Sequence, residues 1–177
     1  MYRLAALACL IAFASACDVA WPNNTDTKLN WFPSCSSPVT FYGLQAQDAK
    51  GNAEYPIKLT EPLVIQADMN NPNNVYKSPN LKSTVNLWSW GSAFACQWSV
   101  VPTFDLLKNL DACTNGVPCP VEKGRKTIPI TLDFSKFDNI IKLLKNDAPY
   151  QMEMILHDTA SNDQTCVTAQ ARALTKS

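Results

Sequence analysis

Cys113-Thr-Asn-Gly-Val-Pro-Cys119-Pro-Val-Glu-Lys-Gly124 is the most informative stretch of this chain. Asn115-Gly116 is a turn dipeptide, and prolines flank the second cysteine. Two cysteines around such a turn are typical of a small loop closed by a disulfide between two extended segments. We therefore expect strands on both sides of this loop, here called the staple loop (113–119), and we interpret the loop as scaffold.

Composition and charge restrict the class of protein. The chain has 177 residues, 46% of them hydrophobic, which fits one domain with a true core. Its 15 basic and 15 acidic residues cancel, and they form no basic block that would mark a nucleic-acid surface. The single histidine, His157, lies near no nucleophile motif, and no phosphate-binding glycine loop or calcium loop occurs. We expect no enzyme, no catalytic residue, no cofactor and no nucleic-acid partner.

The N-terminus has the pattern of a secretory signal peptide. Arg3 precedes an apolar run over 4–13, and Ala14-Ser15-Ala16 supplies a small-residue cleavage site, so we expect a leader over 1–17, cut after residue 16 or 17. The apolar run is shorter than the roughly 20 residues that span a bilayer. This predicts a secreted, extracellular protein. Acylation of Cys17, as in a bacterial lipoprotein, is the alternative.

An oxidising compartment favours disulfides between the remaining cysteines. Cys9 leaves with the leader, and Cys17 remains only if cleavage follows residue 16. A zinc site is the competing interpretation, but it needs about four closely spaced ligands and His157 is distant from the cysteine pair. We expect disulfides and no metal.

Residues 18–34 show neither helical nor strand periodicity, and we expect an N-terminal arm that docks through Trp21, Trp31 and Phe32. The arm contains the glycosylation sequon Asn23-Asn24-Thr25, so a glycan on Asn23 is predicted on a flexible segment.

Alternating apolar and polar residues predict about seven strands in the domain, 35–177. This pattern indicates an all-β, immunoglobulin-like antiparallel β-sandwich. Pro129 removes a ladder donor and predicts an edge strand or a bulge. The predicted strands and hairpin cover 38–47, 63–70, 82–101 with a bend at Gly91-Ser92, 127–134, 149–158 and 164–174.

Two segments suggest helical structure. Ser135 with Asp138 forms a capping-box pattern, and apolar residues follow at helical spacing, so a short amphipathic helix over 135–145 is one of two open interpretations. Such a basic helix either packs on the sandwich, which we favour, or lies on an anionic membrane. Residues 103–110 are compatible with a short helical turn.

The run Cys113-x5-Cys119-Pro120, continued by Val121-Glu122-Lys123-Gly124, resembles the ML lipid-recognition family, as does the closing pattern Tyr150-Gln151-Met152-Glu153 … Cys166-Val167. The similarity covers 35–174. It implies two disulfides, Cys35–Cys166 and Cys113–Cys119. The chain departs from the family between 46 and 57, where no cysteine occurs, and Cys96 has no assigned partner. Cys96 pairs with Cys17 or remains a buried thiol.

The resemblance implies a lipid held between the two sheets: a fatty acyl chain, a sterol or a glycolipid. An ordinary packed core is the alternative for the same apolar rows. If the assumed alternation of a strand is off by one residue, its expected cavity residues would face outward instead. The residues expected to line the cavity are Leu63, Ile65, Met69, Leu87, Ile130, Leu132, Phe134, Met152, Met154 and Leu156.

Trp88, Trp90 and Phe94 crowd the predicted hairpin bend, where they either pack in the core or form a rim that contacts a membrane or covers the pocket mouth. The function implied is a monomeric secreted or endosomal–lysosomal lipid carrier that meets a membrane surface, a lipid-processing enzyme or a receptor. The alternative is a secreted β-sandwich interaction module with a solid core that binds a protein through this hairpin.

Overall fold

A computed structural model describes residues 20–91 and 95–176, without the side chain of Ser135. The predicted leader, Cys17 and Phe94 lie outside these ranges. The strands are β1 (Asn30–Pro33), β2 (Thr40–Gln47), β3 (Ile57–Lys58), β4 (Leu63–Asn71), β5 (Leu81–Trp90), β6 (Trp98–Val100), β7 (Leu110–Asp111), β8 (Gly124–Leu132), β9 (Ala148–Asp158) and β10 (Gln164–Leu174). The helical elements are η1 (Pro22–Asn24), η2 (Ala112–Thr114), η3 (Phe134–Phe137) and α1 (Asp138–Ile141).

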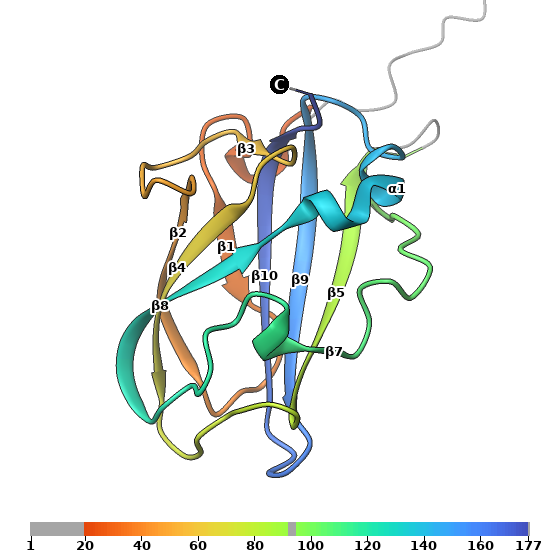
Figure 1. The fold of residues 1–177 in the computed structure, drawn as a ribbon. Helices are drawn as coiled ribbons and strands as arrows, with labels where there is room; N and C mark the ends of the chain where they lie inside the picture. Colours follow the sequence, from red (N-terminus) through yellow and green to blue (C-terminus); the bar gives the residue numbers. More distant parts are fainter. Residues whose placement is uncertain (1–19, 92–94, 177) are drawn as a thin grey trace, which may run out of the picture.

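The strands form two sheets that face each other (Figure 1). The larger sheet has the order β1-β10-β9-β5-β6, with β3 also paired to β10 and β7 to β5, and the smaller sheet has the order β2-β4-β8. All pairings are antiparallel except β3 with β10. The predicted all-β antiparallel sandwich is confirmed. The additional strands β1, β3 and β7 have two to four residues, too few to show a period of two.

Alternation places the predicted apolar rows inside the sandwich. Ala67 is fully buried on β4, and Ile130 on β8 and Met154 on β9 are each 5% exposed. These residues belong to one cluster between the sheets. Pro129 lies on β8, which pairs with β4 alone, so the predicted edge position is confirmed.

The helix is shorter than predicted. η3 and α1 together cover 134–141, and the N-cap residue of α1 is Phe137, which makes no side-chain cap hydrogen bond, so a helix that starts from a Ser135 cap is wrong. Ile140, 2% exposed, anchors α1 in the interior, which is the packing that we favoured over a membrane location.

Residues 103–109 form turns instead of a helix. The Leu106 amide donates to the Thr103 carbonyl, but Phe104 and Asp105 have φ values of 50° and 59°. Because these angles lie in the left-handed region, the turn does not propagate into a helix.

The segment before Cys35 is partly sheet. β1 pairs with β10 from Asn30↔Gln170 to Pro33↔Val167, so this end of the predicted arm is an edge strand held by main-chain hydrogen bonds. Asn23 Nδ2 and Asn30 Nδ2 both donate to Gln170 Oε1, at 2.7 and 2.8 Å. Glycosylation of Asn23 stays a prediction.

Both disulfides that the resemblance implies are present. Cys35–Cys166 ties the segment after β1 to β10, and Cys113–Cys119 closes the staple loop. Cys96 is exposed and disulfide-bonded, so the alternative of a buried thiol is wrong. A Cys17–Cys96 bridge stays a prediction, since Cys17 lies outside the described residues.

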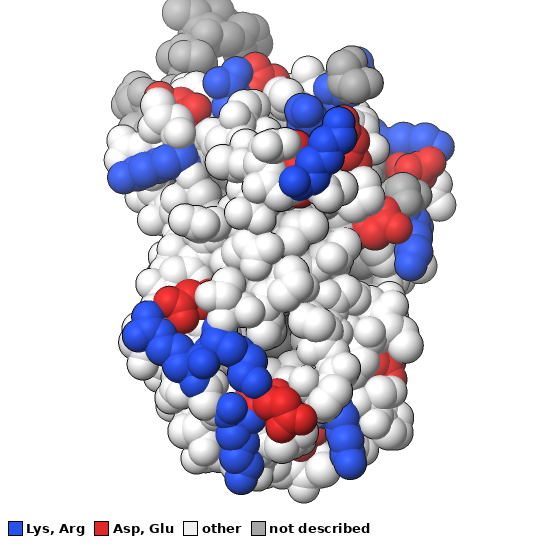
Figure 2. Space-filling view, turned by 60° about the vertical axis from the view of Figure 1, so that its left-hand side comes forward, with Lys and Arg blue, Asp and Glu red and all other residues white. Residues whose placement is uncertain are grey.

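Charged side chains on the face shown in Figure 2 gather toward the two ends of the molecule. Both signs occur in each group, and an uncharged band lies between them (Figure 2). Among the residues that the structure covers, no helix is long and apolar enough to cross a bilayer.

Candidate functional site

A cavity of about 360 Å³ lies between the two sheets. Small-molecule sites in proteins have volumes of about 300–1,000 Å³, so this one is large enough for a ligand. Its wall comes from β4 and β8 of the smaller sheet, from β5, β9 and β10 of the larger sheet, and from β3, η3 and α1. In Figure 1, β3, α1 and the C-terminus lie at the same end of the sandwich. The cavity therefore begins at that end and extends along the sandwich as far as Leu110 of β7.

Small side chains on β10 help to leave this space open. Ala169, Ala171 and Ala173 face the cavity from alternate positions of the strand. Facing sheets lie about 10 Å apart, and larger side chains normally fill that layer. The alanines on β10 leave space that side chains of the facing sheet do not fill. Phe137 of η3 and Ile140 of α1 line the same cavity.

The structure brings most of the predicted lining residues together. The seven that line this cavity are Leu63, Ile65, Leu87, Leu132, Phe134, Met152 and Met154. The other three, Met69, Ile130 and Leu156, line a separate cavity of only about 30 Å³, together with Val39 and Tyr76. Their assignment to the large cavity is wrong, because alternation fixes the face of a residue but not its distance along the strand from the place where the sheets separate.

The staple loop lines the cavity as well as bracing the fold. Before it, β7 pairs with β5; within it, the Gly116 carbonyl accepts a hydrogen bond of 2.9 Å from the Thr131 amide of β8. Thr114, Asn115 and Gly116 contribute to the cavity wall. The loop thus closes the side of the sandwich between the two sheets. Our sequence interpretation missed these residues, although the glycine of the turn was visible.

Further polar residues reach the cavity. Ser83 contributes from β5, while Asp133 and Lys136 contribute from η3 and the residue before it. None of these was predicted, since isolated polar residues in an apolar pattern carry no distinct sequence signal.

No protein-family model matches the sequence, and no curated protein matches it. Among solved structures, the chain is similar to the crystal structure of a Niemann-Pick type C2 protein from the Japanese carpenter ant. The identity is 15%, the match covers 78% of this chain and 96% of that chain, and the TM-score is 0.43.

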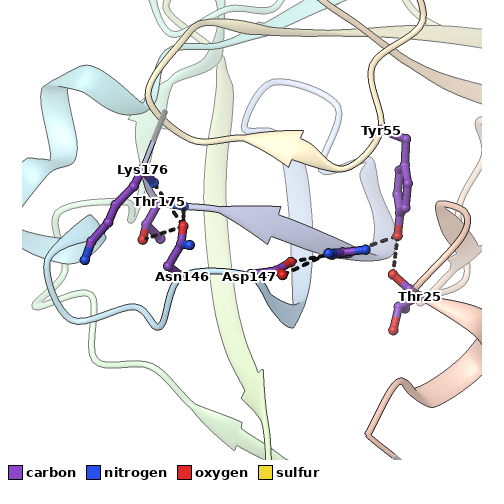
Figure 3. A network of polar contacts seen from close by, with 7 residues as sticks. Thr25, Tyr55, Asn146, Asp147, Thr175 and Lys176 are labelled. Carbon is purple, nitrogen blue, oxygen red and sulfur yellow. Dashed lines mark hydrogen bonds and ion pairs between the residues drawn. The ribbon is translucent and has the colours of Figure 1, made fainter.

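A network of polar contacts connects the segments at the cavity end of the sandwich (Figure 3). The Arg172 guanidinium pairs with both carboxylate oxygens of Asp147 and lies 5.1 Å from the centre of the Trp21 ring. The Arg172 amide donates to the Tyr55 hydroxyl, which donates to the Thr25 carbonyl. Asn146 Oδ1 accepts from the amides of residues 175 and 176 at 2.9 and 3.1 Å. The N-terminal segment, the turn before β9 and the C-terminus are thus fixed to one another.

Ionisation at this end follows from burial and pairing. The hydrogen bonds from Arg172 hold the pKa of the Asp147 carboxyl below its ordinary value. Burial raises the pKa of Tyr150, whose ring lines the cavity and whose hydroxyl donates to the Lys145 carbonyl at 2.8 Å. Tyr150 therefore presents a neutral side chain to the cavity.

The aromatic hairpin faces away from the cavity. Ser83, Val85 and Leu87 of β5 line it, so Trp88 and Trp90, of opposite parity, lie on the outer face of the larger sheet. Trp90 packs edge-on against Trp98 with ring centres 5.1 Å apart. Neither core packing nor cover of the pocket mouth describes these two residues. Membrane contact stays a prediction, as does any role of Phe94, which lies outside the described residues.

No group of three or more His, Cys, Asp or Glu side chains within 20–91 and 95–176 is placed to hold a metal. His157 Nε2 lies 3.2 Å from Asn162 Oδ1 in the β9–β10 hairpin. The mostly apolar side chains of the cavity wall suit an apolar ligand.

Proposed function

We propose that this protein holds a lipid in the cavity between its two sheets. The observation that carries the proposal is the cavity itself, with a predominantly apolar wall built from both sheets. Water in such a space finds few hydrogen-bond partners. An apolar chain or ring system that replaces it gains about 25 cal/mol for each Å² of apolar surface removed from water.

The sequence resemblance to the ML lipid-recognition family supports the same function. Both disulfides that the resemblance implies are present, at the segment before β2 and at the staple loop. Met152 and Met154 in the wall are flexible and polarisable, which favours tolerance of ligand shape. The ligand is a fatty acyl chain, a sterol or a glycolipid, and the protein acts without covalent chemistry as a secreted or endosomal–lysosomal carrier. It delivers this lipid to a membrane, a lipid-processing enzyme or a receptor.

Lipid extraction and a cavity-filling variant test the proposal. Native mass spectrometry of the purified protein, before and after organic extraction, is expected to show a bound lipid, and the extracted protein should take up a fluorescent fatty acid or sterol. Ala171→Phe adds a ring within the cavity and should reduce uptake at least several-fold. Thr127→Phe adds the same ring on the exposed face of β8 and should leave uptake unchanged.

The protein-interaction module remains a second candidate. Val100 on β6 is 74% exposed and Phe104 in the next loop 72%, so apolar surface is available to a partner near the hairpin. The space between the sheets favours the carrier over a module with a solid core. A protein that carries no lipid and takes up neither probe would refute the carrier and favour the module.

A further inference from the structure

Ser83 is a buried hydroxyl group in the wall of the cavity. It is 5% exposed and follows Leu81 on the inner face of β5, where the next two inward positions are Val85 and Leu87. Its side chain makes no hydrogen bond to any other residue within 20–91 and 95–176. Buried hydroxyl groups are normally hydrogen-bonded within the protein, because burial removes their hydrogen bonds to water and leaving these unreplaced costs free energy. The wall thus holds an unused donor and acceptor.

The staple loop adds uncharged polar groups to the cavity wall that contains Ser83. Ser83 pairs with Leu110 of β7, and the chain then continues through η2 into the loop, where Thr114 and Asn115 are exposed and also line the cavity. Asn115 Nδ2 donates to the Asp111 carbonyl at 2.8 Å and to Thr114 Oγ1 at 3.2 Å. Both amide hydrogens are engaged, which leaves Asn115 Oδ1 as an acceptor. Because these loop residues are exposed and also line the cavity, we infer that they form a lip of the cavity.

The charge at this lip favours a neutral ligand group. The groups that line the wall here, Ser83, Thr114, Asn115 and Gly116, carry no charge, so they offer a carboxylate no counter-ion in exchange for its water. The charged residues of the cavity wall are Lys136 of η3 and Asp133, which precedes η3. A hydroxyl group can both donate and accept, which matches Ser83 with Asn115 Oδ1.

We propose that Ser83, with Asn115 at the lip, binds the hydroxyl group of a neutral lipid alcohol whose apolar body fills the cavity. This inference rests on the proposed lipid-binding function and adds the chemical class of the ligand. Ser83 is then a specificity-determining residue, since loss of the ligand's hydroxyl leaves the serine unpaired again.

Matched pairs of probes test the inference. Displacement of N-phenyl-1-naphthylamine gives the affinities of 1-hexadecanol against hexadecane, and of cholesterol against cholest-5-ene, which lacks the hydroxyl. At least one alcohol should bind the unmodified protein about three- to ten-fold more tightly than its matched hydrocarbon, the range of one net hydrogen bond. Ser83→Ala should remove this preference and leave hydrocarbon affinity unchanged. Ser89→Ala, on the same face of β5 but outside the cavity wall, should preserve it.

The outcomes separate the two proposals. Absence of any probe binding by the unmodified protein overturns both. Equal binding of alcohol and hydrocarbon in both pairs, or a preference that survives Ser83→Ala, overturns the lipid-alcohol inference alone. Tighter binding of palmitate than of 1-hexadecanol at neutral pH also overturns it. Thermal unfolding of Ser83→Ala should match that of the unmodified protein, because the hydroxyl has no partner to lose.

Discussion

Gly116 shows how one residue fixes the position of a wall. Its φ is +105°, and a Cβ atom built on it would lie 1.8 Å from the Thr131 carbonyl oxygen. Only a residue without a side chain allows the staple loop to approach β8 this closely. The hydrogen bond from the Thr131 amide then holds the loop against the strand.

Gly116→Ala is therefore expected to destabilise the protein more than an alanine at another left-handed glycine. Gly51 has a φ of +85° with nothing within 4 Å of a Cβ atom. Gly51→Ala should therefore lower the free energy of unfolding only by the strain of a left-handed alanine, about 1–2 kcal/mol. Gly116→Ala must also displace β8 or the loop. Urea unfolding compares the two variants, and equal losses would contradict the close approach as the reason for glycine.

Asp147 has a φ of 57°, a left-handed conformation that Asp and Asn tolerate better than most residues. Its carboxylate pairs with Arg172, which lowers the pKa of the carboxyl. A carboxyl group with a lower pKa in the folded state stabilises the protein above the unfolded pKa of about 3.9. That contribution is lost as the pH falls through the folded value.

We expect Asp147→Asn, which keeps the shape and the backbone preference, to lower the free energy of unfolding near pH 6. The difference from the unmodified protein should shrink as the pH falls and the Asp147 carboxylate takes up a proton in the folded state. Urea unfolding at several pH values measures it. In an Arg172→Gln background the same substitution should have little effect; a full effect there would exclude this ion pair as the cause.

At the scale of elements, β5 separates two environments by its pleat alone. Its inner residues face the cavity, and its outer residues Trp88 and Trp90 belong to an aromatic face with Trp98. The hairpin over 82–101 was predicted from its aromatic and β-branched content. The sequence left open which face Trp88 and Trp90 occupy, because an aromatic pair separated by one serine has the right parity for either face.

Adjacent residues of β5 should therefore respond differently to the same substitution. Leu87→Arg introduces a charge into the cavity wall and is expected to reduce lipid uptake at least ten-fold, whereas Trp88→Arg should change it less than about two-fold. Uptake of a fluorescent sterol by folded variants, checked by circular dichroism, gives the comparison. Loss of uptake in Trp88→Arg would instead indicate a role for the outer face in loading.

At the scale of the whole molecule, the two disulfides constrain very different lengths of chain. Cys35 and Cys166 are 131 residues apart, while Cys113 and Cys119 are separated by 6. In the chain-entropy model, the stabilisation grows with the logarithm of the closed loop. The long bridge therefore limits the unfolded chain more strongly than the staple does.

Replacing Cys35 and Cys166 by serine is expected to cost about 5 kcal/mol, and replacing Cys113 and Cys119 about 2 kcal/mol. Lipid uptake should follow another order, because the staple loop lines the cavity and the long bridge does not. Below its unfolding midpoint, the staple variant should lose more uptake than the other. A larger loss of uptake in the Cys35/Cys166 variant would show that the staple loop has a structural role alone.

The sequence by itself determined the all-β class, the main strands and the inward face of each, because a period of two is a local property of the chain. The resemblance to the ML lipid-recognition family, which residues of the sequence carry, also implied the two cysteine pairs. Only the tertiary structure decided where the sheets separate, since that depends on the sizes of side chains from distant strands, such as Ala171 on β10 and Leu63 on β4. For the same reason the sequence could not show that the smaller cavity is lined by Met69, Ile130 and Leu156. Nor could it show that Ser83 and the staple loop line the larger one.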